Sequence, residues 1–503
     1  MSEANAASSA ASQRSPSRRV VLAPEHVALP GVLAVAATVV VSVVLSATWD
    51  RGANLYLMTA YWAASGLGAL TLTVLWLVLA RRAPDAEAPH ANAGPLLAGD
   101  ARPRIRMRGF GAAAVLVLAV AAAARLTVAI AGQPLLSDDI WRYIHDGATL
   151  GILGENPYAQ SPAETDPDFR GNNPTLVTIY QPASQWVFAG LARLAALPHG
   201  LPADAVFRLG FSVIDLLAIG LLMAALWRAG RSAWWAALYA WHPLAITEVA
   251  GAGHQDPIGI AALIASLLLA SVVAERHTFG ERCPRGVAAW AAGCGAALAC
   301  SVAVKPVVAP IALLVLACWL RRGGKRAWTD IAAAGVSGAM VLAVLYVPFA
   351  LMPGGLERMF DTVGQFTSRW RFNASLHGLL ESGLASKVAA DAVAGGLLLA
   401  VVAALAWRAR SVWTAAGAYL LAALLLSSTA HPWYALWPLA LVAMSREAGA
   451  WALAATVTLA HVAWLTPADL TVPVGLRMME YVPVYAAAGW GVWRHAAHRR
   501  RGR

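Results

Sequence analysis

The chain has 503 residues, of which 59% are hydrophobic and 13% are charged, and its formal net charge is +11. This composition excludes an ordinary soluble enzyme, because apolar runs of membrane-spanning length make up most of the chain. The positive charge does not indicate nucleic-acid binding, since the basic residues fall in short tracts between those runs. The four cysteines have no CxxC spacing, and they predict neither a zinc site nor a disulfide framework.

Apolar runs of roughly 17 to 25 residues predict about fourteen transmembrane helices. The predicted spans are residues 28–48, 55–80, 109–131, 206–228, 231–249, 257–274, 287–303, 306–320, 329–351, 386–407, 411–428, 432–445, 449–466 and 478–494. The sequence therefore predicts an all-α polytopic membrane protein.

The spans and the segments between them suggest four parts. Residues 1–27 are predicted to form a disordered cytoplasmic tail, and the apolar run that follows is too long for a signal peptide. Residues 28–108 hold two transmembrane helices and a flexible cytoplasmic linker, residues 109–445 form the main transmembrane module, and residues 446–503 hold the last helices and a basic tail. No internal repeat is evident.

Residues 178–197 are apolar enough to be mistaken for another span. If they do not cross the membrane, the basic tracts between the spans all fall on one side, which is then the cytoplasm. We therefore interpret this segment as a juxtamembrane helix on the outer surface, with Pro182 near its start and Trp186 and Arg193 at the interface. Both termini are then cytoplasmic, and the long loop 132–205 faces outward.

That outer loop contains the motif SDDIWRYIHDG at residues 137–147. Asp138 and Asp139 are adjacent, so their charges repel and the pKa of one should rise. A carboxylate tuned upward in this way suits a general base that deprotonates an alcohol. The alternative is that the pair caps a helix beginning at Ile140, and the two roles are compatible because one residue suffices as the cap.

Further polar groups are predicted on the same outer side. His254, Gln255 and Asp256 lie in a turn between two spans, and Lys305 precedes Pro306 at a helix break. An ionisable cluster at a helix end that faces the acidic motif is a candidate for the same site. The plainer interpretations are a capped turn and a snorkelling lysine.

Two more segments add positive charge and aromatic rings to the outer side. The loop 352–385 carries Arg369 and Arg371 against the positive-inside trend, and residues 431–434 read His-Pro-Trp-Tyr. Guanidinium forks and lysine ammonium groups suit an anionic phosphate. For His431 the alternative is a helix cap beside interfacial aromatic residues.

On these motifs the chain resembles the GT-C superfamily of integral-membrane glycosyltransferases, over roughly residues 109–445. The resemblance rests on the acidic motif followed by Arg142 and Tyr143, GENPY at 154–158, IYQP at 179–182, the polar run 241–256, Lys305-Pro306, and HPWY at 431–434. It is most similar to the bacterial mannosyltransferases that use polyprenyl-phosphate mannose. Two additional N-terminal spans and the absence of a large soluble C-terminal domain depart from other members and leave the acceptor open.

The resemblance implies a GT-C fold and an inverting glycosyltransferase with Asp139 as the base and Asp138 beside it. It implies the following substrate-binding residues: Arg142, Tyr143, Tyr180, Gln181, His254, Gln255, Asp256, Lys305, Arg369, Arg371, His431, Trp433 and Tyr434. The donor would be a polyprenyl-phosphate sugar, the acceptor a glycan or glycolipid, and no metal or other cofactor is expected. The protein would lie among the lipids of a bacterial plasma membrane, with its site on the periplasmic side.

Two other functions remain open at this stage. One is a lipid or sugar transporter or flippase, which would place polar residues near the middle of the membrane and show related halves. Arg125 and Asp215 are such residues, and we interpret them as structural or interfacial. The other is a glycan polymerase or ligase that uses a lipid diphosphate donor.

Overall fold

The computed structural model describes residues 23–48, 55–82, 109–279, 284–408, 411–465 and 470–501. Within these ranges the regular structure is helical, apart from one isolated bridge between Phe372 and Thr429. This confirms the predicted all-α class.

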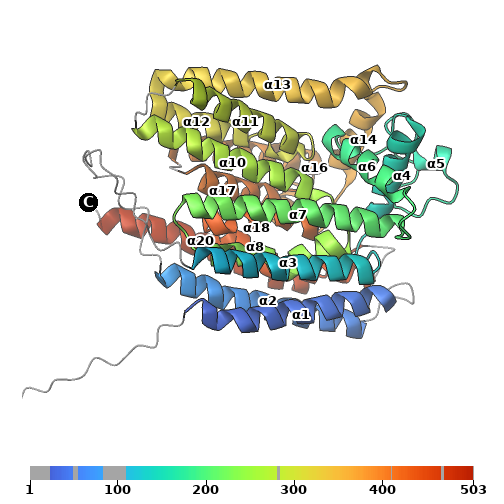
Figure 1. Ribbon diagram of the computed structural model, residues 1–503, viewed down its shortest axis with the longest axis horizontal. Coiled ribbons are helices and arrows are strands. Elements are labelled where there is room, and N and C mark those ends of the chain that lie inside the picture. The colour runs from blue at the N-terminus through green and yellow to red at the C-terminus, as the bar shows by residue number, and fades with distance from the viewer. Residues whose placement is uncertain are drawn as a thin grey trace, which may run out of the picture.

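Helices that lie side by side form the bundle (Figure 1). They are α1 (Glu25–Thr48), α2 (Leu55–Arg82), α3 (Phe110–Ala131), α7 (Ala203–Arg228), α10 (Asp256–Phe279), α11 (Pro284–Val302), α12 (Ile311–Gly323), α13 (Ala327–Leu351), α16 (Lys387–Arg408), α17 (Val412–Leu425), α18 (Leu436–Ser445), α19 (Ala448–Thr456) and α20 (Val474–Arg501).

Short helices gather at one end of this bundle, which we call the loop end (Figure 1). They are α4 (Asp139–Ala148), η2 (Thr149–Leu153), α5 (Pro162–Thr165), α6 (Pro182–Ala195), α14 (Glu357–Arg369) and α15 (Leu376–Leu384). The other end, where α7, α10 and α12 finish, we call the basic end, because each of these helices has arginine in its last turn.

Eight helical stretches are long and apolar enough to cross a membrane within the described ranges. They are Glu25–Thr48, Leu55–Arg81, Phe110–Ala131, Ala203–Arg228, Asp256–Thr278, Pro306–Leu351, Lys387–Arg408 and Ala448–Leu465. In the stretch Pro306–Leu351 only 6% of the apolar window is buried, so its hydrophobic side chains suit contact with lipid. The chain is thus a multi-pass membrane protein.

The count of fourteen spans stays a prediction. The 46-residue stretch Pro306–Leu351 contains two predicted spans, separated by the short helix η6 (Gly324–Arg326). The predicted span 231–249 is instead a chain of short pieces: η3 (Ala233–Ala236), α8 (Ala237–Ala240), α9 (Pro243–Ile246) and η4 (Thr247–Gly251). Pro243 lacks the backbone N–H that a continuous helix would require there, which accounts for the break before it.

Two predicted boundaries can be compared with the structure. Helix α1 begins at Glu25, inside the predicted tail 1–27, and most of that tail lies outside the described residues, as does the linker 83–101. Helix α6 begins at Pro182 as expected and packs against α4 at the loop end. It has 14 residues, fewer than any of the eight stretches above, and its juxtamembrane position stays a prediction.

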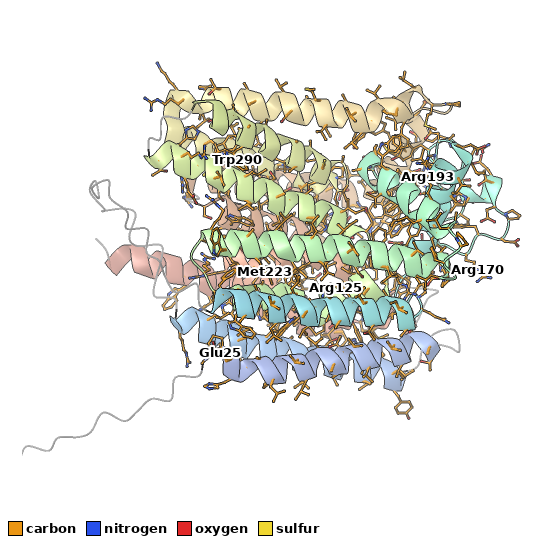
Figure 2. The ribbon with its side chains drawn as sticks, in the orientation of Figure 1. Glu25, Arg125, Arg170, Arg193, Met223 and Trp290 are labelled. Carbon is orange, nitrogen blue, oxygen red and sulfur yellow. The ribbon has the colours of Figure 1, made fainter. Side chains whose placement is uncertain are left out.

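Arg125 and Asp215 form a fully buried ion pair between α3 and α7, with 2.6 Å between Nε and Oδ2. The Tyr239 hydroxyl donates to the other oxygen of Asp215, and the guanidinium of Arg125 also donates to the Ala240 carbonyl. Figure 2 places Arg125 partway along α3, whereas Arg170 and Arg193 lie at the loop end. Because the buried charges satisfy one another, the pair fits the structural role expected of it.

Candidate functional site

Helix α4 begins at Asp139, one residue before the predicted start at Ile140. The Ser137 hydroxyl accepts a hydrogen bond from the backbone N–H of Asp139 at 3.2 Å, whereas the Asp138 side chain makes no capping bond. Asp138 thus occupies the N-cap position, but its side chain does not cap the helix. Serine reaches the free N–H and leaves both carboxylates available.

The Asp139 carboxylate is held by groups from distant parts of the chain. The Asn172 amide donates to Oδ1 at 3.1 Å, the Tyr180 side chain also hydrogen-bonds to the carboxylate, and His254 Nδ1 lies 3.8 Å from Oδ2. Burial raises the pKa of Asp139, and the hydrogen bonds from Asn172 and Tyr180 oppose the rise. The negative charge of Asp138 raises this pKa as predicted, but burial is the larger cause.

Arg142 and Tyr143, both predicted to bind substrate, are buried behind Asp139. The Arg142 guanidinium donates to the backbone carbonyls of Leu176, Asn172 and Asn173, at 2.9, 3.0 and 2.7 Å. The Tyr143 ring stacks on Phe188 and meets Tyr180 edge to face. Both residues thus contact the loop that carries Asn172 and Tyr180, and they hold it in position beside Asp139.

The GENPY motif (154–158) and the IYQP motif (179–182) contact each other next to these residues. The Tyr158 hydroxyl donates to the Tyr180 carbonyl at 2.7 Å, and Gln181 Oε1 accepts from the Tyr346 hydroxyl of α13 at 2.8 Å. Gln255 Oε1 accepts a 2.5 Å hydrogen bond from the Ser184 hydroxyl in α6. Gln181 and Gln255 therefore connect α6 to α13 and to the turn before α10.

The turn before α10 brings His254 to Asp139. Gly253 has φ +76°, and a Cβ there would lie 2.6 Å from Ile140 Cδ1 and 2.9 Å from Arg208 Cγ, so glycine alone fits. The His254 ring is fully buried and stacks on Trp433 with 3.9 Å between centroids. Burial lowers the pKa of His254 well below its usual value, so the ring is neutral near pH 7.

Lys305 lies at the same end and is paired with Asp256. Its Nζ is 2.6 Å from Asp256 Oδ1, which also accepts from the Trp437 indole N–H at 2.5 Å. The ammonium group lies 3.7 Å from the centroid of the Tyr434 ring, within the range of a cation–π interaction. Burial lowers the pKa of Lys305, and the negative charge of Asp256 opposes that change.

Four aromatic rings form a continuous stack between the loop 352–385 and the turn of His254. The stacked centroids are 4.5 Å apart for Phe372 and His431, 4.4 Å for His431 and Trp433, and 3.9 Å for Trp433 and His254. Burial lowers the pKa of His431 to about 3. His431 is therefore neutral near pH 7, and the positive charge predicted for it is wrong.

The outer arginines, which run against the positive-inside trend, are paired with acids. Arg371 is half exposed and binds Glu381 at 2.7 Å, and Arg358 binds Glu164 at 3.0 Å. Arg369 is exposed at the end of α14. Across the described ranges, no hydrogen bond or ion pair joins Arg369 or Arg371 to Asp139 or Lys305. The structure thus does not bring these two predicted phosphate ligands into the cluster.

A cavity of about 530 Å³ opens beside Lys305 at the loop end. Its apolar wall includes Val307, Phe366, Leu398 and Leu426. His377, Asp391 and Tyr434 also line it, and the Lys305 ammonium group lies over the Tyr434 ring. An amphiphile with an anionic group near Lys305 thus finds apolar surface next to it.

The described residues contain no group of three or more His, Cys, Asp and Glu side chains placed to hold a metal ion. Cys294, Cys300 and Cys318 are free thiols. Metal independence stays a prediction.

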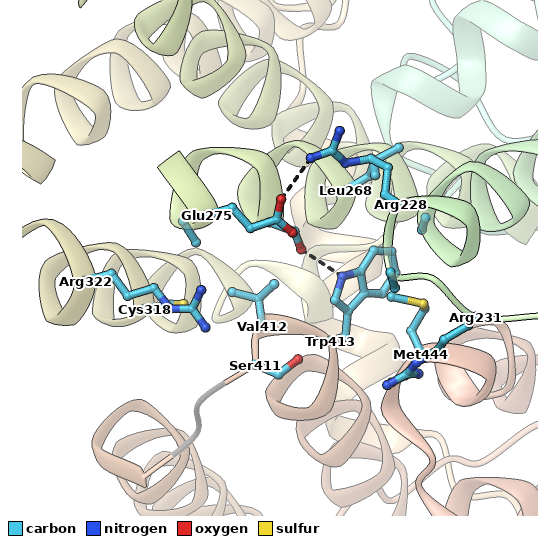
Figure 3. Close-up of a pocket in the computed structure, with 14 residues that line it drawn as sticks. Arg228, Arg231, Leu268, Glu275, Cys318, Arg322, Ser411, Val412, Trp413 and Met444 are labelled. Carbon is cyan, nitrogen blue, oxygen red and sulfur yellow. Dashed lines mark hydrogen bonds and ion pairs between the residues drawn. The ribbon is translucent and has the colours of Figure 1, made fainter. Parts of the chain in front are cut away.

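Another cavity, of about 200 Å³, lies at the basic end (Figure 3). Arg228 binds Glu275 across it at 2.9 Å, and Arg322 from α12 also lines it. The Trp413 indole N–H donates to the Ser271 hydroxyl at 2.9 Å. None of the predicted site residues lines this cavity.

Several residues of the cluster were missed from the sequence: Asn172, Phe372, Trp437 and His461. Glu248 was noticed as part of the polar run 241–256 but was not predicted as a site residue. Asn172 belongs to an Asn-Asn-Pro turn in the acidic loop, which was a usable signal. Phe372 and His461 gave none, because single residues in apolar surroundings show no pattern until the chain is folded.

Comparisons with protein-family models, with curated proteins and with solved structures find no match for this chain. Its function is therefore argued from the site itself.

Proposed function

We propose that this protein is an inverting glycosyltransferase that moves a sugar, mannose in the preferred case, from a polyprenyl-phosphate donor to a hydroxyl of a lipid or glycan acceptor. One observation carries the proposal. The partly buried carboxylate of Asp139 lies at the same end of the bundle as the buried ammonium group of Lys305, and the two interact electrostatically.

The chemistry requires a base on one side and positive charge on the other. Asp139 takes the proton of the acceptor hydroxyl while that oxygen attacks the anomeric carbon. The bond between this carbon and the phosphate oxygen breaks, and the polyprenyl phosphate leaves with the electron pair. Because the raised pKa of Asp139 makes it a stronger base than an exposed aspartate, burial serves the reaction.

Lys305 suits the leaving phosphate. It is held by Asp256 and Tyr434, so its ammonium group is in place before substrate binds, as electrostatic stabilisation of a leaving group requires. The apolar cavity of Val307, Phe366 and Leu426 lies alongside and offers a place for the first prenyl units.

The distribution of charge supports an outward-facing site. Arginines end α7, α10 and α12 at the basic end, whereas Arg358 and Arg371 at the loop end are neutralised by Glu164 and Glu381. By the positive-inside rule the basic end is cytoplasmic. In a bacterial plasma membrane the loop end would then face the periplasm.

The proposal is tested with purified full-length protein in lipid vesicles that contain short-chain polyprenyl-phosphate mannose and a lipid extract as the source of acceptors. We expect free polyprenyl phosphate to appear together with a mannosylated lipid of inverted anomeric configuration. Movement of the donor between leaflets without cleavage of its sugar–phosphate bond would overturn the proposal in favour of a transporter. Protein with Asp139→Asn serves as the control for contaminating transferases.

A further inference from the structure

Glu248 is a buried carboxylate behind the candidate site that the proposed reaction does not use. It lies in η4, is completely inaccessible to solvent, and is flanked by two histidines that are also fully buried. His461 Nε2 lies 2.7 Å from its Oε1, and His254 Nε2 lies 3.3 Å from its Oε2. A chain of polar groups thus runs from Asp139 through His254 and Glu248 to His461.

The contact between Glu248 and His461 contains one proton. His461 Nδ1 lies 3.1 Å from the Thr458 carbonyl, which only accepts, so this nitrogen carries hydrogen. Neutral His461 would then present a bare Nε2 to Glu248 Oε1. At 2.7 Å two lone pairs would repel, so a proton lies between them. Glu248 Oε2 is thereby left as an acceptor that faces His254.

His254 has one ring proton and two nitrogens that can carry it. Nε2 is 3.3 Å from Glu248 Oε2, whereas Nδ1 is 3.8 Å from Asp139 Oδ2. Both nitrogens and Glu248 Oε2 are buried and make no hydrogen bond among the described residues. Buried polar groups are nearly always paired, so a small adjustment that joins Nε2 to Oε2 is favoured. The nearer acceptor is Glu248, and Nδ1 is then free of hydrogen.

We propose that Glu248 and His461 are positioning residues that hold the His254 proton on Nε2, so that the bare Nδ1 accepts a hydrogen bond from Asp139 once Asp139 has taken the proton of the acceptor hydroxyl. This inference rests on the proposed function. The proton passes from the acceptor oxygen to Asp139 Oδ2 and stays there, shared with His254 Nδ1. A group that binds the protonated form of a base strengthens the base, which is the benefit to the reaction.

Other ionisable groups lie near the row of polar groups that runs from Asp139 to His461, but they do not form its hydrogen bonds. Tyr61 of α2 meets the His461 ring edge to face, with 5.5 Å between centroids. The positive charge of Lys305 also acts on His254 and disfavours a second proton on it. His254 therefore stays neutral, and its tautomer is the property that Glu248 controls.

The structure offers a conservative pair of substitutions at Glu248. Gln keeps an oxygen to accept from His254 Nε2, and its amide N–H can donate to His461, so Glu248→Gln should retain the tautomer. Met has a similar size but offers no strong acceptor, so Glu248→Met should shift the proton to Nδ1, where it would stabilise ionised Asp139. Glu480 on α20 is the matched control. It is an equally buried carboxylate that is held by Asn373, and it does not belong to the row of polar groups from Asp139 to His461.

The tautomer is measured by ¹⁵N NMR of histidine-labelled full-length protein in detergent, with the His254 signals assigned by their loss in His254→Asn. We expect an unprotonated Nδ1 in the wild type and in Glu248→Gln, and a protonated Nδ1 in Glu248→Met. A protonated Nδ1 in the wild type overturns the proposal. This reading needs no substrate, so it stands even if no glycosyl transfer is detected. If the wild type transfers the sugar but carries the His254 proton on Nδ1, the proposed function stands and only the role of Glu248 and His461 fails.

The pH dependence of single-turnover transfer gives the second reading. In Glu248→Met we expect the acidic limb of the pH–rate profile, where the rate falls as Asp139 becomes protonated, to move to lower pH by about one unit. The plateau rate should fall about tenfold, because Asp139 becomes a weaker base. Glu248→Gln should stay within about twofold of the wild type, and Glu480→Met should not move the limb. Equal loss of rate in both Glu248 variants, with an unmoved limb, contradicts the proposal and indicates a purely structural role.

Discussion

The two ends of the helical bundle each have a cavity and a cation paired with a carboxylate, yet the two pairs differ in how deeply they are buried. At the loop end, Lys305 and Asp256 are mostly buried, with side-chain exposures of 21% and 3%. At the basic end, Arg228 and Glu275 are 39% and 48% exposed. Buried charges are costly to keep, whereas exposed pairs contribute only about 0 to 1 kcal/mol. This difference in burial supports the choice of the loop end for the proposed site.

The arginines of the basic end have an explanation that needs no ligand. Arg228, Arg276 and Arg322 all lie in the last turns of their helices, where positive charge complements the helix dipole. Their position also matches the cytoplasmic bias that orients membrane proteins. Lys305 has neither explanation, because it precedes the helical segment that begins at Pro306.

The largest effect is expected from Asp139→Asn. The amide has nearly the same size but cannot take a proton, so the rate of transfer should fall at least about 10³-fold. Single-turnover assays in vesicles measure this, and size-exclusion chromatography checks the fold. Activity near the wild-type level would show that Asp139 is not the base. The assignment of the proposed site to the loop end rather than the basic end would then lose its main support.

Lys305→Gln should have the next largest effect. It removes the positive charge proposed to meet the leaving phosphate, and we expect the rate to fall about 10²-fold. Because Asp256 loses its ion pair, Asp256→Asn combined with Lys305→Gln controls for the unpaired carboxylate. If the double variant regains wild-type activity, Lys305 only neutralises Asp256.

The pH profile should show the raised pKa of Asp139. Transfer requires the ionised carboxylate, so the rate should fall as the pH decreases through this pKa, at a higher pH than for an exposed aspartate. Asp138→Asn removes a neighbouring negative charge, lowers that pKa and should move the acidic limb slightly to lower pH. The plateau should change by no more than about threefold. A limb that moves to higher pH would contradict the assigned neighbour effect.

The smallest effect is expected at the basic end. Arg228→Gln with Glu275→Gln removes the ion pair across the cavity of Figure 3, and transfer should stay within about twofold of the wild type. The same vesicle assay measures it. A loss comparable to that of Lys305→Gln would show that the basic end also takes part in the reaction.

The sequence predicted the helical class well, because apolar runs report membrane burial directly. It predicted that a helix starts near Pro182, and the structure confirms this start. The outer-surface position inferred from charge placement around residues 178–197 stays a prediction. It did not predict the broken segment 233–251, since hydropathy averages over a window and does not register that Pro243 interrupts the hydrogen bonds. For the same reason the number of crossings cannot be read from composition.

The site was predicted in part. Asp139, His254 and Lys305 stand out in sequence because ionisable residues are rare between apolar runs. Their partners do not, because Asn172 and Trp437 become neighbours only through packing of distant helices. Arg142 shows the opposite failure, since a charge beside the acidic motif looks like a ligand until its three carbonyl partners are seen. Sequence identifies unusual residues, whereas burial and geometry decide what they do.

The most direct measurement is mass spectrometry of lipid-linked sugars and envelope glycans from cells that carry either the wild-type protein or Asp139→Asn. Loss of the base should leave the donor unused, so one polyprenyl-phosphate sugar should accumulate while one glycosylated product disappears. The pair of changed species would name both substrates. Identical profiles in the two strains, with equal amounts of protein in the membrane, would contradict the assignment of Asp139 as the base of a glycosyltransferase.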